Sequence, residues 1–199
     1  MSATIDSERY KHVVEIGAGD SMCSQALMLL KGADRVTLYE PNTILCADLK
    51  RVAIGRKTVT VVESAVDGTS GTAPLIHLGY ASYLLGAPSF VKLSIENDGE
   101  KWLSPLVKEV KLVRMGEIDS GDIDHLILTN NGCEMAVLCG MKSRPGVIQT
   151  KHYIHNEAQG KQSGLVCNWL HEHGYRAQVK AVNRYQTHYH LMWSFQSKE

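Results

Sequence analysis

Two kinds of apolar run alternate along the first third of the chain. Residues 12–16 and 35–40 are short, apolar and rich in β-branched side chains, as expected for strands buried on both faces. Residues 21–31 and 43–54 instead carry their apolar side chains at helical spacing, and residues 58–66 are β-branched again. This β-α-β-α-β order predicts an α/β fold with a parallel sheet, right-handed crossovers and helices on both faces.

The rest of the chain has a weaker pattern that still fits one α/β unit. Residues 68–121 hold short apolar stretches among glycine and proline, which predict short strands and loops laid against the sheet. The tail, residues 175–195, predicts an antiparallel pair of strands. No repeat or linker interrupts the sequence, so we expect a single domain over residues 1–199. Further strands are predicted at residues 123–128 and 146–150, and further helices at residues 133–141 and 163–173.

Composition narrows the function classes. The 21 Lys and Arg residues balance the 21 Asp and Glu residues, so the basic surface typical of nucleic-acid binders is not expected. The first residues are polar, and charges interrupt every apolar run before the roughly 20 residues that cross a bilayer. We therefore predict a cytoplasmic protein without a nucleic-acid or membrane partner; a homo-oligomer stays open. The five cysteines include no C-x-x-C pair and predict reduced thiols.

A glycine turn follows the first predicted strand. Gly17 and Gly19 allow a tight turn and a close approach of the backbone to a ligand. Asp20 or Ser21 is expected to cap the next helix, whose first N–H groups would then face the ligand. Dinucleotide-binding turns have a third small residue, but that place falls on Met22. The bulky Met22 disfavours NAD or FAD and suits a cofactor without a pyrophosphate.

Acidic side chains flank this turn. Glu40 ends the second predicted strand, where a carboxylate can accept hydrogen bonds from both ribose hydroxyls. Glu15 is placed for the methionine end of S-adenosylmethionine (SAM). The predicted cofactor is therefore SAM, with Glu15, Gly17, Gly19, Glu40 and Ala65 as the binding residues. The alternatives are an ordinary strand-to-helix turn and a solvated acid at Glu40.

Several segments resemble the FkbM-type SAM-dependent methyltransferases. They are V-E-I-G-A-G at 14–19, L-Y-E-P-N at 38–42, I-D at 123–124 leading to G-C-E-M-A-V-L-C-G-M at 132–141, and R-P at 144–145. The resemblance extends from about Tyr10 to about Tyr175. It implies a three-layer Rossmann-like methyltransferase fold and the methylation of a hydroxyl oxygen on a sugar or another small metabolite.

One element of the resemblance is degenerate. The family usually carries K-I-D-V-E-G before the later helix, where this chain has I-L-T-N-N-G at 127–132. Ile127, Thr129 and Asn131 replace three ionisable residues at the carboxyl end of a core strand, the edge where ligands bind in open α/β sheets. The acid-base chemistry that the resemblance implies therefore needs another source.

Two asparagines and a histidine are the remaining catalytic candidates. Asn130 and Asn131 can orient an acceptor hydroxyl by hydrogen bonding, but an amide cannot deprotonate it. His152 and His155 follow the fifth predicted strand, and an imidazole titrates in the range that suits a base. We expect His152 to be the base, against the alternative of an exposed loop histidine.

Three functions compete. The leading hypothesis is a small-molecule O-methyltransferase, and the second is a non-catalytic SAM-binding or structural relative. The third, a nucleotide-binding oxidoreductase, is disfavoured by Met22. The pairs His171/His173 and His188/His190 suggest a metal, but no third ligand is evident, and histidines near a helix end already stabilise its carbonyl dipoles. No metal is predicted.

Overall fold

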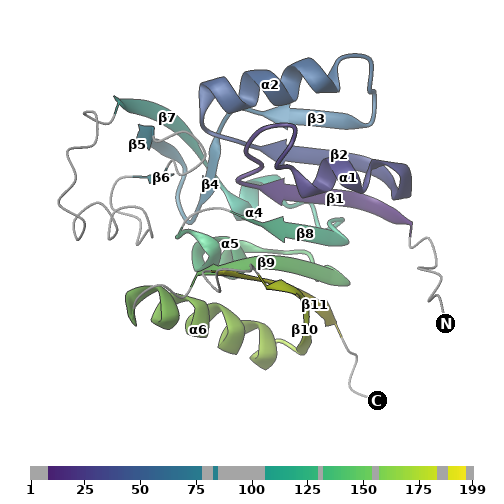
Figure 1. The fold of residues 1–199 in the computed structure, drawn as a ribbon, viewed down its shortest axis with the longest axis vertical. Coiled ribbons are helices and arrows are strands. Elements are labelled where there is room, and N and C mark those ends of the chain that lie inside the picture. Colours follow the sequence, from purple (N-terminus) through teal and green to yellow (C-terminus); the bar gives the residue numbers. More distant parts are fainter. Residues whose placement is uncertain are drawn as a thin grey trace.

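A computed structural model describes residues 9–77, 83–84, 106–129, 132–153, 157–182 and 188–195. Its centre is a seven-stranded sheet in the order β10-β11-β9-β8-β1-β2-β3 (Figure 1). The strands are β1 (Tyr10–Ile16), β2 (Ala33–Tyr39), β3 (Val59–Val62), β8 (His125–Leu128), β9 (Val147–Tyr153), β10 (Tyr175–Val182) and β11 (His188–Phe195).

The predicted parallel arrangement is confirmed. β1 pairs in parallel with β2 on one side and with β8 on the other, and β3 and β9 extend the sheet in parallel. Val36 of β2 lies opposite both Val13 and Val59. The tail adds the expected antiparallel pair, because β11 runs against both β9 and β10. All parallel strands consequently present their carboxyl ends at one edge.

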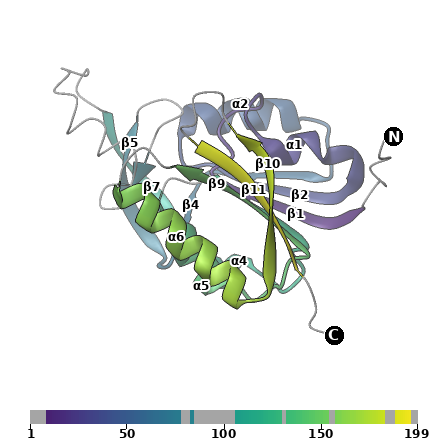
Figure 2. The ribbon, with the colours of Figure 1, turned by 60° about the horizontal axis from the view of Figure 1, so that its bottom comes forward.

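Helices cover both faces of this sheet, and Figure 2 shows α2 and α6 on opposite sides of it. Successive side chains of β1 point to opposite faces of the sheet, so both faces are apolar and need a covering helix. Val13 packs in the core cluster that holds Leu49 of α2, whereas Val14 packs in the cluster that holds Val166 and Leu170 of α6. The helices are α1 (Gln25–Met28), the 3-10 turn η1 (Leu30–Gly32), α2 (Thr43–Ala53), α4 (Met115–Ile118), α5 (Glu134–Gly140) and α6 (Glu157–Glu172). None of the helices in the described ranges is long and apolar enough to span a membrane.

A second sheet was not predicted. It has the order β4-β7-β5-β6, and its own small core includes Ala65, Leu75 and Leu112. The strand predicted near residues 58–62 is confirmed as β3, but the β-branched run to Val66 is not one strand, because the chain turns at Ser64 and Ala65 then pairs with Leu112 in the second sheet. Its strands are β4 (Ala65–Asp67), β5 (Gly71–His77), β6 (Tyr83–Leu84) and β7 (Leu106–Arg114).

The helix after the glycine turn is shorter than predicted. Ser24, not Asp20 or Ser21, is its N-cap, and the Ser24 hydroxyl accepts from the Leu27 amide at 3.3 Å. The Asp20 carboxylate instead accepts from the amides of Met22 and Cys23 at 3.0 and 2.9 Å. Asp20 thus stabilises an extra turn between the glycines and the helix, which delays the start of α1.

Candidate functional site

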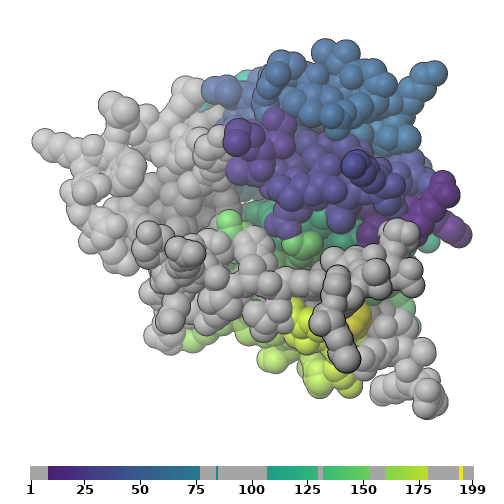
Figure 3. All heavy atoms as spheres, turned by 45° about the vertical axis from the view of Figure 1, so that its right-hand side comes forward, coloured from purple at the N-terminus to yellow at the C-terminus, as the bar shows by residue number. Residues whose placement is uncertain are grey.

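The glycine turn is held by the strands on both sides of β1. Gly17 and Gly19 have φ angles of 81° and 69°, in the left-handed region that favours glycine. The carbonyl of Tyr39, at the end of β2, accepts from the Gly17 amide at 2.9 Å. From the other side, the Thr129 hydroxyl donates to the Gly17 carbonyl at 2.7 Å. In Figure 3 the purple segment after β1 and the blue segment that follows it in sequence lie next to each other on one face.

Glu40 lies directly against this turn. One carboxylate oxygen accepts from the Gly19 amide and the other from the Asn42 amide, each at 2.8 Å. The side chain is only 5% exposed, and burial raises the pKa of Glu40 to about 7. Each oxygen of a carboxylate can accept a second hydrogen bond, so Glu40 can still bind a diol.

Glu15 acts on the helix side of the turn. Its carboxylate accepts from the Ser24 hydroxyl at 2.5 Å and from the amides of Gln25 and Ala26 at 3.1 and 3.0 Å. The first amides of α1 are therefore bound within the chain, contrary to the prediction that they face a ligand. Burial raises the pKa of Glu15 to about 7. A direct contact between Glu15 and a cofactor stays a prediction.

The two acids limit which ligand the turn can accept. A pyrophosphate binds at such a turn through free amides, but here Glu15 and Glu40 already occupy the amides of Gln25, Ala26 and Gly19. A phosphate would also meet two carboxyl groups that repel it when ionised. The geometry thus strengthens the argument against a dinucleotide that began with Met22.

Ser64 is a candidate that sequence reasoning missed. It follows β3 at the same edge, where the Glu40 amide donates to the Val62 carbonyl at 3.1 Å. The Ser64 side chain is fully buried, and its hydroxyl has no hydrogen-bond partner among the described residues. An unsatisfied buried hydroxyl is unfavourable, and it marks a place where a ligand can supply the partner. The sequence signal for Ser64 was its position next to Ala65, which was a predicted cofactor-binding residue. Ala65 is 7% exposed.

The structure describes part of the sheet edge at the carboxyl ends of β8 and β9, where the predicted catalytic residues were expected. His152 lies within β9, not in a loop after it, and is 4% exposed. Its Nε2 lies 2.6 Å from the Thr150 hydroxyl, which accepts from the Trp193 indole at 2.9 Å. Thr150 is opposite Leu128, so His152 extends beyond the end of β8. Asn130, Asn131 and His155 lie outside the described residues.

One buried acid lies near the end of β8. Glu134 begins α5, and its carboxylate accepts from the Gly132 amide at 3.1 Å. Burial raises the pKa of Glu134 to about 7, although hydrogen bonds from Gly132 and Gln162 oppose the shift. Sequence reasoning did not select this residue, because it belongs to an ordinary helix start.

The metal hypothesis gains no support from the described part of the chain, which holds no group of three or more His, Cys, Asp or Glu side chains suited to an ion. His171 and His173 lie at the end of α6. The His173 Nδ1 donates to the Trp169 carbonyl at 2.7 Å, as expected for a histidine that binds the last carbonyls of a helix.

No protein-family model matches this sequence, and no curated protein does. Several solved structures are similar in fold. FkbM from Methylobacillus flagellatus KT has a TM-score of 0.59 at 12% identity, over 92% of this chain and 43% of that one. Fibrillarin from Aeropyrum pernix, with natively bound SAM, has a TM-score of 0.54 at 9% identity, over 94% and 67%.

An rRNA methylase from Streptococcus thermophilus has a TM-score of 0.52 at 9% identity, over 96% of this chain and 89% of that one. At such identities the similarity shows the fold and not the substrate. The predicted FkbM relationship is therefore supported only at the coarser level of architecture. This chain has the Rossmann-like fold of the class I SAM-dependent methyltransferases.

Proposed function

We propose that the chain binds SAM across the glycine turn, with the ribose on Glu40. The observation that carries this proposal is the position of the Glu40 carboxylate, 2.8 Å from the Gly19 amide with acceptor capacity left on both oxygens. SAM also has the right charge, because its sulfonium is a cation and the two acids at the turn attract cations when ionised.

Two further residues fit the same ligand. The buried hydroxyl of Ser64 offers a hydrogen bond to the purine end, next to Ala65 on the β3 side of Glu40. Gly17 and Gly19 leave the backbone free of Cβ atoms where the cofactor would approach. Fibrillarin, which has a similar fold, binds SAM, and this supports the proposal.

Calorimetric titration with SAM and its demethylated product, S-adenosylhomocysteine (SAH), tests cofactor binding. Glu40→Gln keeps the size of the side chain and removes its charge, so SAM affinity is expected to fall by about tenfold to a hundredfold. Glu117→Gln is the matched control, because Glu117 is a half-exposed acid on α4, before β8. Equal affinity of the Glu40→Gln variant and the wild type would refute the ribose assignment.

We further propose that the protein methylates a hydroxyl oxygen of a small metabolite, in the manner of FkbM-type enzymes. SAM supplies an activated methyl group when bound. The acceptor must then be aligned and, if its hydroxyl is protonated, deprotonated. Asn130 and Asn131, which come after β8 in the sequence, are the residues proposed to orient the acceptor, and His152 is the proposed base.

The position of His152 supports its assignment as base. β9 lies two strands from β1, a separation of roughly 10 Å. His152 also projects beyond β8 on the same edge as the glycine turn. The hydrogen bond to Thr150 fixes the orientation of the imidazole, which is what a positioned base requires.

A non-catalytic SAM-binding protein is the second candidate, and one observation favours it. Thr129 occupies the place of the family's aspartate, and its hydroxyl is bonded to the Gly17 carbonyl. This residue therefore supports the cofactor turn and supplies no acid to the acceptor. Transfer of labelled methyl groups from SAM to a pool of hydroxylated metabolites distinguishes the two candidates.

A further inference from the structure

A second pocket lies at the opposite edge of the main sheet from the glycine turn. Its volume is about 330 Å³, and its walls come from the end of α5, the segment before β9, the end of α6 and the start of β10. The glycine turn follows the carboxyl end of β1, whereas Met141 and Ser143 of this pocket precede the amino end of the parallel strand β9. The two sites are therefore separate.

One wall of this pocket is flat and aromatic. Trp169 and His173 lie one helical turn apart at the end of α6, and their rings stack with centroids 3.7 Å apart and planes at 13°. The Trp169 carbonyl accepts from the backbone amide of His173 at 3.0 Å and from its Nδ1 at 2.7 Å, which fixes the imidazole against the indole. The stack is thus a preformed surface for another planar group.

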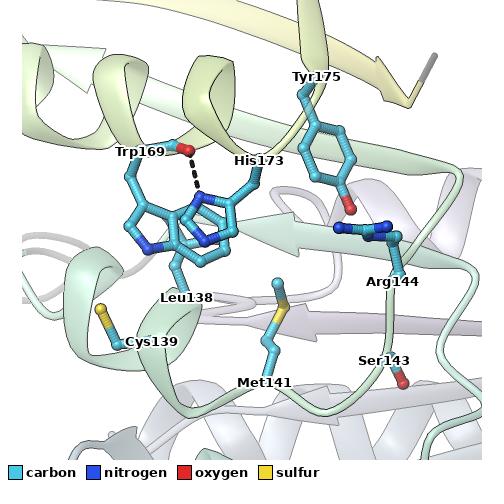
Figure 4. A pocket seen from close by; sticks show the side chains of 8 residues that line it. All are labelled: Leu138, Cys139, Met141, Ser143, Arg144, Trp169, His173 and Tyr175. Carbon is cyan, nitrogen blue, oxygen red and sulfur yellow. Dashed lines mark hydrogen bonds between the residues drawn. The ribbon is translucent and has the colours of Figure 1, made fainter. Parts of the chain in front are cut away.

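The residues next to the stack are apolar at their contact surfaces. Leu138 and Met141 come from the end of α5, and Figure 4 shows the Met141 side chain pointing into the space between Trp169 and Tyr175. The Tyr175 hydroxyl donates to the Pro145 carbonyl at 2.9 Å, which fixes the phenol. A thioether also makes favourable contacts with aromatic rings. A ring bound at the stack can therefore contact apolar atoms at its edges as well as on its face.

His173 supplies a hydrogen-bond acceptor at the edge of the stack. Its Nδ1 carries the proton, because a carbonyl only accepts, so Nε2 of the neutral imidazole keeps a lone pair. Nε2 has no hydrogen-bond partner among the residues that the structure describes. The Arg144 guanidinium, beside the Tyr175 phenol in Figure 4, already interacts within the chain, and the Ser143 hydroxyl is bonded to Asp119. Polar recognition in this pocket therefore depends on His173.

We propose that this pocket binds a planar heteroaromatic ring that carries an N–H group, such as an indole. The imidazole of His173 is smaller than the indole of Trp169, and Figure 4 shows that it covers only part of that ring. A ligand ring beside the imidazole, in the same layer, stacks on the rest of the Trp169 face and donates its in-plane N–H to Nε2. Stacking thus selects a flat ring, and the single acceptor selects a donor at its edge.

Indole is the probe, and benzothiophene, which has the same planar bicyclic shape without the N–H, tests the hydrogen bond. His173→Phe keeps an aromatic ring against Trp169 and removes the acceptor. NMR titration of the full chain is expected to show that this variant binds indole about three- to tenfold more weakly than the wild type and binds benzothiophene with unchanged affinity. His173 is exposed, so the substitution should not disturb folding.

His171→Phe is the matched control. His171 is an exposed histidine near the same helix end, bonded to Arg176 and absent from the described pocket lining, so this change should leave both affinities unchanged. Trp169→Leu removes the face on which the probes stack and should weaken both of them by about fivefold. Saturating SAH should not displace indole, because the cofactor turn lies at the other edge.

Four results would each overturn the assignment of this pocket. They are no binding of indole at millimolar concentration, an equal effect of His173→Phe on the two probes, an equal effect of His171→Phe and His173→Phe on indole, and displacement of indole by SAH. The comparison of the two histidine variants does not depend on whether Trp169→Leu folds, since both histidines are exposed.

Discussion

The carboxylate of Glu40 accepts a hydrogen bond from the Gly19 amide at 2.8 Å, which joins the end of β2 to the glycine turn after β1. The bond spans two segments 21 residues apart in sequence and also positions an acid at the edge of the sheet. A change at Gly19 should therefore affect both folding and ligand binding, whereas a change at a glycine away from the turn, such as Gly55, should affect folding alone.

Gly19→Ala tests this relationship against Gly55→Ala. Both glycines have positive φ, 69° and 78°, so alanine at either position should reduce the free energy of unfolding by about 1 to 2 kcal/mol. Only at Gly19 does the added Cβ meet a neighbour, the Cys23 Cβ at 3.3 Å. We expect urea unfolding to show a larger loss for Gly19→Ala, and SAM binding to weaken in that variant alone. Normal SAM binding by the Gly19→Ala variant would show that the glycine turn is not part of the cofactor site.

SAM affinity should increase with pH. The carboxyl of Glu40 has a pKa raised to about 7 by burial, and its ionised form binds a ribose diol and a cation better than its neutral form. Affinity should rise by up to about tenfold per pH unit below pH 7 and level off above it. Titration of wild type and Glu40→Gln across this range measures the effect, and a parallel slope in both proteins would assign the pH dependence to another group.

The stabilisation that Glu15 gives to the ligand-free protein should decrease as pH rises, which is the opposite of the trend expected for SAM affinity. The pKa of Glu15 is about 7 in the folded chain, above the ordinary 4.5 of a glutamate carboxyl, so the stabilisation is complete below pH 4.5 and is lost as pH rises through 7. Burial, and then Arg35, lower the pKa of His12, so the stabilisation from His12 increases as pH rises. The free energy of unfolding of wild type minus that of Glu15→Gln isolates the Glu15 contribution. This difference should decrease between pH 5 and pH 8, by an amount on the order of 3 kcal/mol.

Asp119 should be among the most sensitive structural positions. Its buried carboxylate accepts from the amides of Gly121, Lys142 and Ser143 at 2.8, 2.7 and 2.6 Å, and from the Ser143 hydroxyl. Burial opposes ionisation, but these bonds together lower the pKa of Asp119, so its contribution is lost as pH falls through the lowered value. Asp119→Ala should reduce the free energy of unfolding by about 3 kcal/mol or more.

Asp34→Ala provides the comparison for Asp119. Asp34 forms a salt bridge with Arg9 at 2.7 Å, and both side chains are largely exposed. An exposed pair contributes at most about 1 kcal/mol, so this variant should unfold close to the wild type in urea. Similar losses in the two variants would show that the Asp119 bonds contribute little.

The parts of the fold that the sequence predicted are those with local signals. β1 and β2 contain short apolar stretches rich in β-branched residues that stop before Gly17 and Pro41, and buried parallel strands have this pattern. The second sheet has a weaker signal: short strands were predicted within residues 68–121, where β5 and β7 lie, but β4 begins after β3 with only Glu63 and Ser64 between them. Its existence depends on pairing between Ala65 and Leu112, a contact that no local pattern encodes.

The candidate site shows the same division. Glu40 and the two glycines were evident because a strand end and a turn are local features. Ser64 and Thr129 were missed, since their importance comes from partners on other strands or from the lack of one. His152 was expected after the fifth strand, which was predicted to end at Thr150, but pairing with Tyr189 of β11 extends β9 through this position. Non-local pairing thus determined what sequence reasoning missed.

The role of His152 decides whether the proposed activity has a base. Thr150 binds one imidazole nitrogen at 2.6 Å and is itself bound by the Trp193 indole, so the ring is held by a chain of two hydrogen bonds. If His152 removes the acceptor proton, His152→Ala should lower methyl transfer by about a hundredfold or more while leaving SAM affinity unchanged. Methyl transfer from labelled SAM is measured with a pool of hydroxylated metabolites at several pH values.

Thr150→Val separates a positioned base from a merely structural histidine. The variant keeps the shape of the side chain and loses the hydroxyl, so the imidazole remains but its orientation and its protonation change. We expect a shifted pH profile of methyl transfer with SAM affinity retained, because Thr150 lies on β9, away from the glycine turn. Transfer that persists undiminished in His152→Ala would eliminate this base, and Glu134, whose pKa is raised to about 7, would be the next candidate to test. If the wild type binds SAM but transfers no methyl group at any pH, the non-catalytic function is favoured. Thr129, which replaces the family's aspartate, would then serve only to support the cofactor turn through its bond to the Gly17 carbonyl.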